Sequence, residues 1–236
     1  MNSATQFFDG ETQQFAANYE RKAGFKDRLK LFVEAVRKTT PKPAKVLDFG
    51  CGPGVIALEL ARLGYDVLGM DGSAEMVRMS QGRVTKHGLK NIRFEHSDAE
   101  GLTLPMDEFD AVVCSSVVEY VKEDIALIKK LVASVKPKGH LILSVPHTSS
   151  LIGKTEDFVR SVRDGKRGRH LSYSLRRYRK AELCSTLRGM GLHSIACTNF
   201  EFPLFGSLGV QISRLSVFGA MVLIRGQRAE ESRQTQ

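Results

Sequence analysis

Short apolar runs alternate with stretches of helical spacing along this chain, and the alternation predicts an α/β fold. Strands separated by helices of ten to fifteen residues are typical of parallel sheets. The expected helices lie at residues 55–63, from residue 73, at 124–135 and at 179–190. The expected strands lie at residues 46–49, 66–70, 92–95, from residue 109, and at 140–145, 193–200 and 217–224.

The two ends of the chain follow other patterns. Aromatic residues mix with polar ones up to Phe25, residues 27–37 have helical spacing, and a breaker cluster follows at 39–43. We therefore expect three parts: an N-terminal helical cap, a main domain with an insertion on the substrate side, and a frayed polar tail. Their expected bounds are 1–40, 41–225 with the insertion at 147–175, and 226–236.

The first expected strand runs directly into a glycine-rich turn that contains Gly50, Gly52 and Gly54. Glycines allow the backbone to approach a ligand where any Cβ atom would collide with it. The helix that follows directs its free N–H groups and the positive end of its dipole at the same place. This pattern indicates a nucleotide-type cofactor site at the first strand-to-helix turn.

The spacing of the turn narrows the choice of cofactor. A dinucleotide-binding G-x-G-x-x-G motif would need a third glycine at position 55, where the chain has Val55, and no Gly-Lys-Ser/Thr ending of a P-loop is present. Asp48 lies two residues before the first glycine, where a carboxylate repels a pyrophosphate but suits an ammonium group. A nicotinamide or flavin site and a purely structural turn remain as alternatives.

The segment Leu47–Gly54 resembles the first motif of the class I S-adenosylmethionine-dependent methyltransferases. The resemblance implies a Rossmann-like, seven-stranded, mostly parallel sheet with helices on both faces. Its last strand is expected to be antiparallel and inserted between the fifth and the sixth. The resemblance also implies that Asp48, Gly50, Cys51, Gly52 and Gly54 hold the methionine end of the cofactor, S-adenosyl-L-methionine, beneath a lid that includes Tyr19.

Two further segments support the same resemblance. Asp71 follows the second strand about twenty residues after the glycine turn, where a carboxylate accepts hydrogen bonds from ribose hydroxyls. The residues Asp71, Ser73 and Met76 resemble the Asp-x-Ser-x-x-Met motif of the ubiquinone- and menaquinone-biosynthesis (type 11 domain) methyltransferase group, and Gly72 lies within that motif. In the same family an Asp-Ala pair after the third strand reads the adenine, which Asp98 and Ala99 match.

The fourth strand ends at the place where the reacting methyl group would project, and this places Ser115 at the cofactor. Residues 114–117 read Cys-Ser-Ser-Val rather than the Asn/Asp-Pro-Pro-aromatic motif of DNA methyltransferases, which disfavours a nucleic acid acceptor. The following Glu119-Tyr120-Val121 resembles the Glu-His-Val of the quinone O-methylating branch, with Tyr120 in place of histidine.

Charge and composition bear on the partners. The formal net charge is +9, and residues 160–180 hold nine Lys or Arg against one acid, Asp164. This basic segment is either a solvated loop or a contact with an anionic acceptor or an anionic membrane surface. The four cysteines show no metal-ligand spacing, so no metal is expected. No signal peptide or membrane-spanning run is apparent, and the expected location is cytoplasmic, with peripheral membrane contact left open.

These observations predict a methyltransferase that acts on a small molecule, with a hydroxyl as the expected acceptor. A hydroxyl acceptor calls for a general base. The candidates are His147, which follows the fifth strand, and His170 in the insertion. Three alternatives remain open. The chain could methylate a carbon or nitrogen of a small or lipid-linked acceptor, it could be an RNA or protein methyltransferase that uses the basic insertion, or it could be a non-catalytic cofactor-binding regulator.

Overall fold

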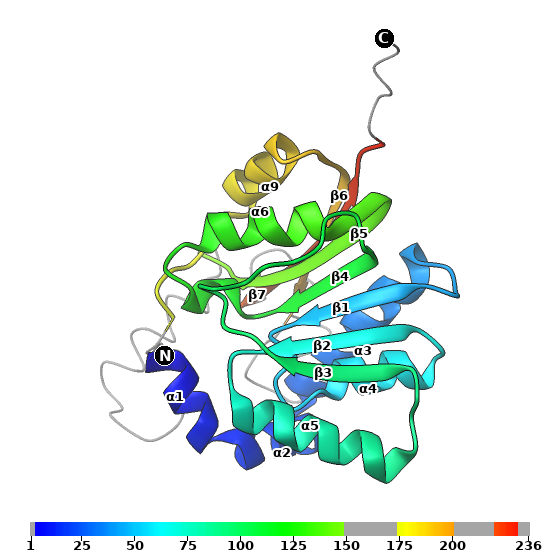
Figure 1. The fold of residues 1–236 in the computed structure, drawn as a ribbon. Helices are drawn as coiled ribbons and strands as arrows, with labels where there is room; N and C mark the ends of the chain where they lie inside the picture. The colour runs from blue at the N-terminus through cyan, green and yellow to red at the C-terminus, as the bar shows by residue number, and fades with distance from the viewer. Residues whose placement is uncertain (1–2, 149–173, 201–219, 231–236) are drawn as a thin grey trace, which may run out of the picture.

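The computed structural model describes residues 3–148, 174–200 and 220–230, and a seven-stranded sheet forms its centre (Figure 1). The strand order is β3-β2-β1-β4-β5-β7-β6. The strands are β1 (Lys45–Phe49), β2 (Asp66–Asp71), β3 (Ile92–His96), β4 (Phe109–Ser115), β5 (Val135–Pro146), β6 (Leu192–Phe200) and β7 (Met221–Arg228). The order reverses between β1 and β4, and such a point is where open α/β sheets bind ligands.

The directions of the strands confirm the predicted fold class. Strands β1 to β5 pair in parallel, whereas β7 is antiparallel to both of its neighbours, β5 and β6. Strand β7 is therefore inserted between β5 and β6, as the resemblance implied.

Helices cover both faces of the sheet (Figure 1). The face beside Val46 packs against α3 (Ala23–Thr39), α4 (Val55–Arg62) and α5 (Ala74–His87). The opposite face, beside Leu47, packs against α6 (Asp124–Ser134) and α9 (Lys180–Gly189). Because the central strands are buried on both sides, they read as continuous apolar runs, which is why the sequence pattern located them.

The first helices, α1 (Ser3–Gly10) and α2 (Thr12–Arg21), lie near the end of the sheet toward which the parallel strands point (Figure 1). The expected cap of residues 1–40 is thus helical over its described part. Its last helix, α3, also belongs to the layer on the sheet, because Phe32 and Val36 are fully buried against the core there.

Two strand bounds differ from the prediction. Strand β7 covers residues 221–228, so residues 226–228 belong to the sheet and not to a frayed tail; the predicted strand residues 217–219 lie outside the described residues. Polar side chains at the end of β7 hydrogen-bond to backbone carbonyls of other segments. The Arg228 guanidinium donates to the Ala133 carbonyl at 2.9 Å, and the Gln227 amide donates to the Lys138 carbonyl at 3.0 Å. Strand β5 begins at Val135, because the expected turn at 136–139 forms an irregularity within the β4–β5 pairing.

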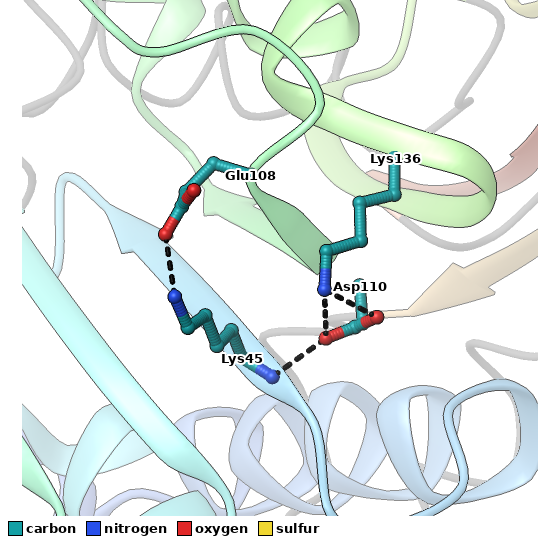
Figure 2. A network of polar contacts seen from close by, with 4 residues as sticks. All are labelled: Lys45, Glu108, Asp110 and Lys136. Carbon is teal, nitrogen blue, oxygen red and sulfur yellow. Dashed lines mark hydrogen bonds and ion pairs between the residues drawn. The ribbon is translucent and has the colours of Figure 1, made fainter.

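A polar network joins the amino ends of β1, β4 and β5 at the edge of the sheet away from the glycine turn (Figure 2). Asp110 accepts the Lys45 backbone N–H at 2.8 Å, and both its oxygens accept the Lys136 ammonium at 2.9 and 3.0 Å. The Lys45 ammonium binds Glu108 at 2.7 Å. Asp110 therefore has a structural role.

Candidate active site

A cavity opens where the carboxyl ends of β1, β2 and β4 meet, and residues of α1, α2 and α3 form another part of its wall. All the predicted cofactor-binding residues except Gly54 line it: Tyr19, Asp48, Gly50, Cys51, Gly52, Asp71, Gly72, Met76, Asp98, Ala99 and Ser115. The topology brings these residues together because each lies at or just after the carboxyl end of a parallel strand or belongs to a helix over the same edge.

The glycine turn is held by hydrogen bonds to β2. The backbone N–H groups of Gly50 and Cys51 donate to the Met70 carbonyl at 2.7 and 3.0 Å. Gly52 has a φ of +53°, and a Cβ atom added there would meet nothing closer than the Phe15 ring at 4.0 Å. The absent side chain of Gly52 thus leaves open space in the cavity.

Gly54, unlike the other glycines of the turn, does not line the cavity. A Cβ atom at Gly54 would lie 2.7 Å from the Phe94 ring and 2.8 Å from the Ser80 hydroxyl, and its φ is +72°. The position needs glycine because β3 and α5 pack against the turn.

Asp48 is a buried carboxylate at the floor of the cavity, with 1% of its surface exposed. Within the part of the chain that the structure describes, neither carboxylate oxygen has a hydrogen-bond partner. Burial, and to a smaller extent the charge of Asp71, raises the pKa of Asp48 to about 7, while the Ala57 amide counteracts this without reaching hydrogen-bond geometry. A buried carboxylate without a partner is costly, and a cationic group in the cavity would offset that cost.

Asp71 ends β2 and fixes the neighbouring loops. One of its oxygens accepts the Gly52 N–H at 2.7 Å and the other accepts the Ser73 N–H at 2.8 Å. Burial raises the pKa of Asp71 despite these two hydrogen bonds. The Ser73 hydroxyl accepts the Met76 N–H at 3.1 Å, which caps α5, and also donates to Asp9 of α1. Asp71 keeps acceptor capacity toward the cavity, since each oxygen has a second lone pair.

Aromatic rings from separate elements meet at the wall of the cavity. Phe8 of α1 lies edge-to-face with Phe15 of α2 at 5.7 Å and with Tyr120 at 5.4 Å, centroid to centroid. Tyr120 belongs to the short 3₁₀ helix η1 (Val118–Tyr120) that follows β4. We call Phe8, Phe15, Tyr19 and Tyr120, which all line the cavity, the aromatic wall.

Arg28 also lines the cavity and was missed by the sequence reasoning, as was Phe8. Its side chain is buried, and its guanidinium lies 5.3 Å from the centroid of the Phe25 ring. One signal was available: Arg28 lies four residues before the buried Phe32, which places a cation on the apolar face of α3.

Comparison with known proteins now identifies the family. The sequence model of a methyltransferase domain family matches residues 17–196, which is most of the chain. The chain belongs to this methyltransferase family. Curated relatives agree: the mitochondrial ubiquinone biosynthesis O-methyltransferase of Schizosaccharomyces pombe is 36% identical over 102 residues, 42% of this chain and 37% of that protein. The ubiquinone biosynthesis O-methyltransferase of Coxiella burnetii is 33% identical over 108 residues, 46% of each chain. The chain thus spans less than half the length of the curated relatives it matches.

Solved structures show the same fold. A methyltransferase of Haloferax volcanii, in complex with the Trm112 methyltransferase activator, superposes with a TM-score of 0.70 at 18% identity over 94% of this chain and 98% of that one. Magnesium protoporphyrin IX methyltransferase from Synechocystis, with bound S-adenosylhomocysteine, superposes with a TM-score of 0.65 at 19% identity over 88% and 86%. The Rossmann-like methyltransferase fold is therefore confirmed.

S-adenosylmethionine is the methyl donor of this family, and the residues of the methyltransferase fit it. The unpartnered Asp48 carboxylate suits the methionine ammonium, and the open space at Gly52 admits a ligand against the backbone. Asp71 lies where the ribose hydroxyls would be bound.

The two histidines proposed as bases do not join this cavity in the described residues. His147 is 3% exposed and outside the lining; its backbone N–H donates to the Ala220 carbonyl at 3.0 Å. Burial, and to a lesser degree Lys180, lowers the pKa of His147. Strand β5 continues one residue further than the apolar pattern indicated, and the backbone at His147 then pairs with Tyr178 in a parallel bridge. His170 lies outside the described residues.

Only the last part of the basic segment, residues 174–180, is described, and two of its cations have acidic partners elsewhere in the chain. Arg176 binds the buried Asp124 at 2.7 Å, and Arg179 lies 3.5 Å from Glu182. Contact with an anionic acceptor or membrane stays a prediction. In the described part of the chain, no helix has both the length and the hydropathy needed to cross a membrane.

Proposed function

We propose that this methyltransferase transfers the methyl group of S-adenosylmethionine to the hydroxyl of a small aromatic acceptor. The observation that carries the proposal is the aromatic wall, which places the rings of Phe8, Phe15 and Tyr120 beside the acidic cofactor floor. Aromatic rings stack edge-to-face or offset against a planar acceptor, which favours a ring over an aliphatic chain. The names of the curated relatives, which are O-methyltransferases of ubiquinone biosynthesis, support an oxygen acceptor.

The residues around the cavity act mainly by positioning. When bound, S-adenosylmethionine supplies an electrophilic methyl group on a sulfonium. Asp48 would face the ammonium end, and Asp71, which holds the glycine turn in place, would accept the ribose hydroxyls. Asp98 and Ala99 lie where the adenine edge would be read, and Ser115 lies at the end of β4. Such fixed alignment of two reactants is worth up to about 7–11 kcal/mol in favourable cases.

The need to remove a proton from the acceptor also favours an aromatic hydroxyl over an aliphatic one. No histidine is present among the described residues that line the cavity. A phenolic hydroxyl has a pKa of about 10, far below that of an aliphatic alcohol. A weaker general base is therefore enough to remove its proton. Tyr120, which replaces the histidine of the quinone O-methylating branch, contributes a ring to the acceptor side.

A matched set of acceptors tests the proposal. The full chain is incubated with S-adenosylmethionine labelled in the methyl group and with a phenol, the corresponding aniline, the corresponding benzyl alcohol, or a tRNA pool. We expect label in the phenol alone. Label in the aniline alone would assign N-methylation, and label in tRNA would assign an RNA acceptor; either result would overturn the proposal.

A pair of variants tests the aromatic wall itself. Phe8→Ala should raise the KM for the phenol by about tenfold, because a ring contact with the acceptor is lost. Met106→Ala, at a side chain that is 69% exposed and outside the lining, should leave that KM unchanged. Equal effects of the two substitutions would remove Phe8 from the acceptor site.

A further inference from the structure

Two cysteine thiols face each other on the side of the sheet covered by α9. The Sγ atoms of Cys184 in α9 and Cys197 in β6 are 3.5 Å apart, and both cysteines are free. Cys184 is buried, with 6% of its surface exposed, whereas Cys197 is exposed. Neither residue lines the cofactor cavity, so this pair is separate from the methyl-transfer site.

The backbone holds the two thiols in this position. Helix α9 ends at Gly189 and β6 begins at Leu192, so a very short turn connects them. The N–H of Met190 donates to the carbonyls of Thr186 and Leu187 at 3.1 Å, and the N–H of Ala229 donates to the Gly191 carbonyl at 2.9 Å. Strand β6 is paired with β7 at Cys197, opposite Ile224. These hydrogen bonds fix the position of α9 relative to β6, and the two thiols lie between the helix and the strand.

The geometry needs only a small change to form a covalent bond. A disulfide has a sulfur–sulfur distance of about 2.05 Å, so the two Sγ atoms must approach by about 1.5 Å, which rotation about the side-chain bonds can supply. We propose that Cys184 and Cys197 form a reversible intramolecular disulfide by exchange with a low-molecular-weight disulfide, for which oxidised glutathione is the probe.

The exchange takes two balanced steps. The Cys197 sulfur, as thiolate, attacks one sulfur of oxidised glutathione; a mixed disulfide forms and one glutathione thiolate leaves. The Cys184 sulfur, after loss of its proton, then attacks the Cys197 sulfur and releases the second glutathione. Two protein thiols are oxidised, one disulfide is reduced, and the protons are taken up by the two glutathione thiolates.

The difference in exposure sets the order of these steps. Cys197 is reachable from solvent, so it attacks first, and Cys184 resolves the mixed disulfide from inside. The residue is exposed, but its sulfur is partly buried against Cys184; this partial burial and the neighbouring thiol raise the pKa of Cys197 to about 11, against the opposing effect of Lys180 and Arg188. The exchange is therefore slow at neutral pH, and the pair is stable as thiols until a disulfide donor accumulates.

Mass spectrometry of the intact chain after incubation with oxidised glutathione tests the proposal. The wild-type chain should lose the mass of two hydrogens and give one cross-linked peptide that contains both cysteines. Cys184→Ser should accumulate one glutathione adduct at Cys197, because the resolving thiol is absent. Cys197→Ser should not react, because the remaining thiol of the pair is buried. A stable adduct on the wild-type chain, or no reaction at all, would overturn the proposal.

A control and a stability measurement complete the test. Cys114 is buried in β4 with a pKa raised by burial, and Cys114→Ala should form the same cross-link as the wild type. Closing the short loop between α9 and β6 should raise the Tm of the oxidised chain by about 5–10 °C, and dithiothreitol should reverse this shift. An oxidised chain that melts below the reduced one would contradict a bond that the native fold accommodates.

Discussion

The backbone N–H of Gly52 donates to the carboxylate of Asp71 at 2.7 Å, which joins the glycine turn after β1 to the end of β2. The other oxygen of Asp71 accepts the N–H of Ser73, the residue that caps α5. The carboxylate expected to bind the ribose therefore also builds the cavity in which the cofactor would lie. Affinity and stability should change together when this carboxylate is altered.

Asp71→Ala should weaken the binding of S-adenosylhomocysteine and lower the Tm. Hydrogen bonds to a charged group are worth about 1.5–3 kcal/mol each, so the affinity should fall by roughly tenfold to a hundredfold or more. The N–H groups of Gly52 and Ser73 lose their acceptor, which destabilises the turn. Asp71→Asn keeps one acceptor oxygen and should lie between the two. Titration calorimetry and thermal melting measure the two effects.

Asp110→Asn is the matched control for Asp71, since it alters a carboxylate that also holds a backbone N–H (Figure 2), but one at the amino ends of β1 and β4. It should lower the Tm and leave the affinity for S-adenosylhomocysteine unchanged. If a folded Asp71→Ala protein bound the ligand as tightly as this control, Asp71 would not belong to the binding site.

The two glycines Gly52 and Gly54 should respond differently to alanine. Both have positive φ, so either substitution costs roughly 1–2 kcal/mol of stability. A methyl group at Gly52 enters the cavity and should reduce affinity for S-adenosylhomocysteine by about tenfold or more. A methyl group at Gly54 meets Phe94 and Ser80, which adds about 1–3 kcal/mol of overpacking but leaves the cavity open. Binding and melting measured on both proteins would show the contrast, and a Gly54→Ala protein that is stable but unable to bind would reverse the assignment.

The sequence predicted the residues whose position depends on the order of strands. Asp48, Asp71 and Asp98 each lie at or just after the end of a parallel strand, and parallel strands end at one edge of the sheet. Phe8 and Arg28 were missed because they reach the cavity through the packing of α1 and α3, which hydrophobic spacing does not determine. The end of β7 was predicted too early for a related reason: Gln227 and Arg228 are half-buried and held by tertiary hydrogen bonds, which a hydropathy pattern cannot detect.

His147→Gln should lower the Tm but leave the kcat nearly unchanged. The side chain is buried outside the described lining, so we expect the kcat to stay within about threefold of the wild type, whereas loss of a general base costs about 10²–10⁴. Steady-state kinetics beside a thermal melt separates the two roles. Were His147 the base after all, the acidic limb of the pH–rate profile would fall below pH 6.5, because burial and Lys180 lower its pKa, and that limb would vanish in the variant.

Asp48→Asn should stabilise the fold at pH 8 while it weakens ligand binding. The folded pKa of Asp48 is about 7 against 3.8 in the unfolded chain, so the folded state holds a proton that the unfolded state loses between these values. Stability thus falls as the pH rises from about 4 to about 7 and is then constant, and the total loss is at most about 4 kcal/mol. The neutral amide avoids that cost, so denaturant unfolding should show the variant more stable at pH 8 and equal to the wild type near pH 4.

The affinity for S-adenosylhomocysteine should also depend on the ionisation of Asp48, but it should rise with pH where the stability falls. If the ammonium of S-adenosylhomocysteine pairs with ionised Asp48, as proposed, wild-type affinity should rise by up to about tenfold per pH unit between about pH 5.5 and 7, then level off. Complex formation near pH 6 should release a proton, which calorimetry in buffers of different ionisation enthalpy detects. The Asp48→Asn protein should bind weakly with little dependence on pH and without proton release. Asp110→Asn should retain the wild-type pH dependence, because its carboxylate lies at the amino ends of β1 and β4. A wild-type affinity that is constant from pH 5.5 to 8 would show that the ligand does not engage Asp48.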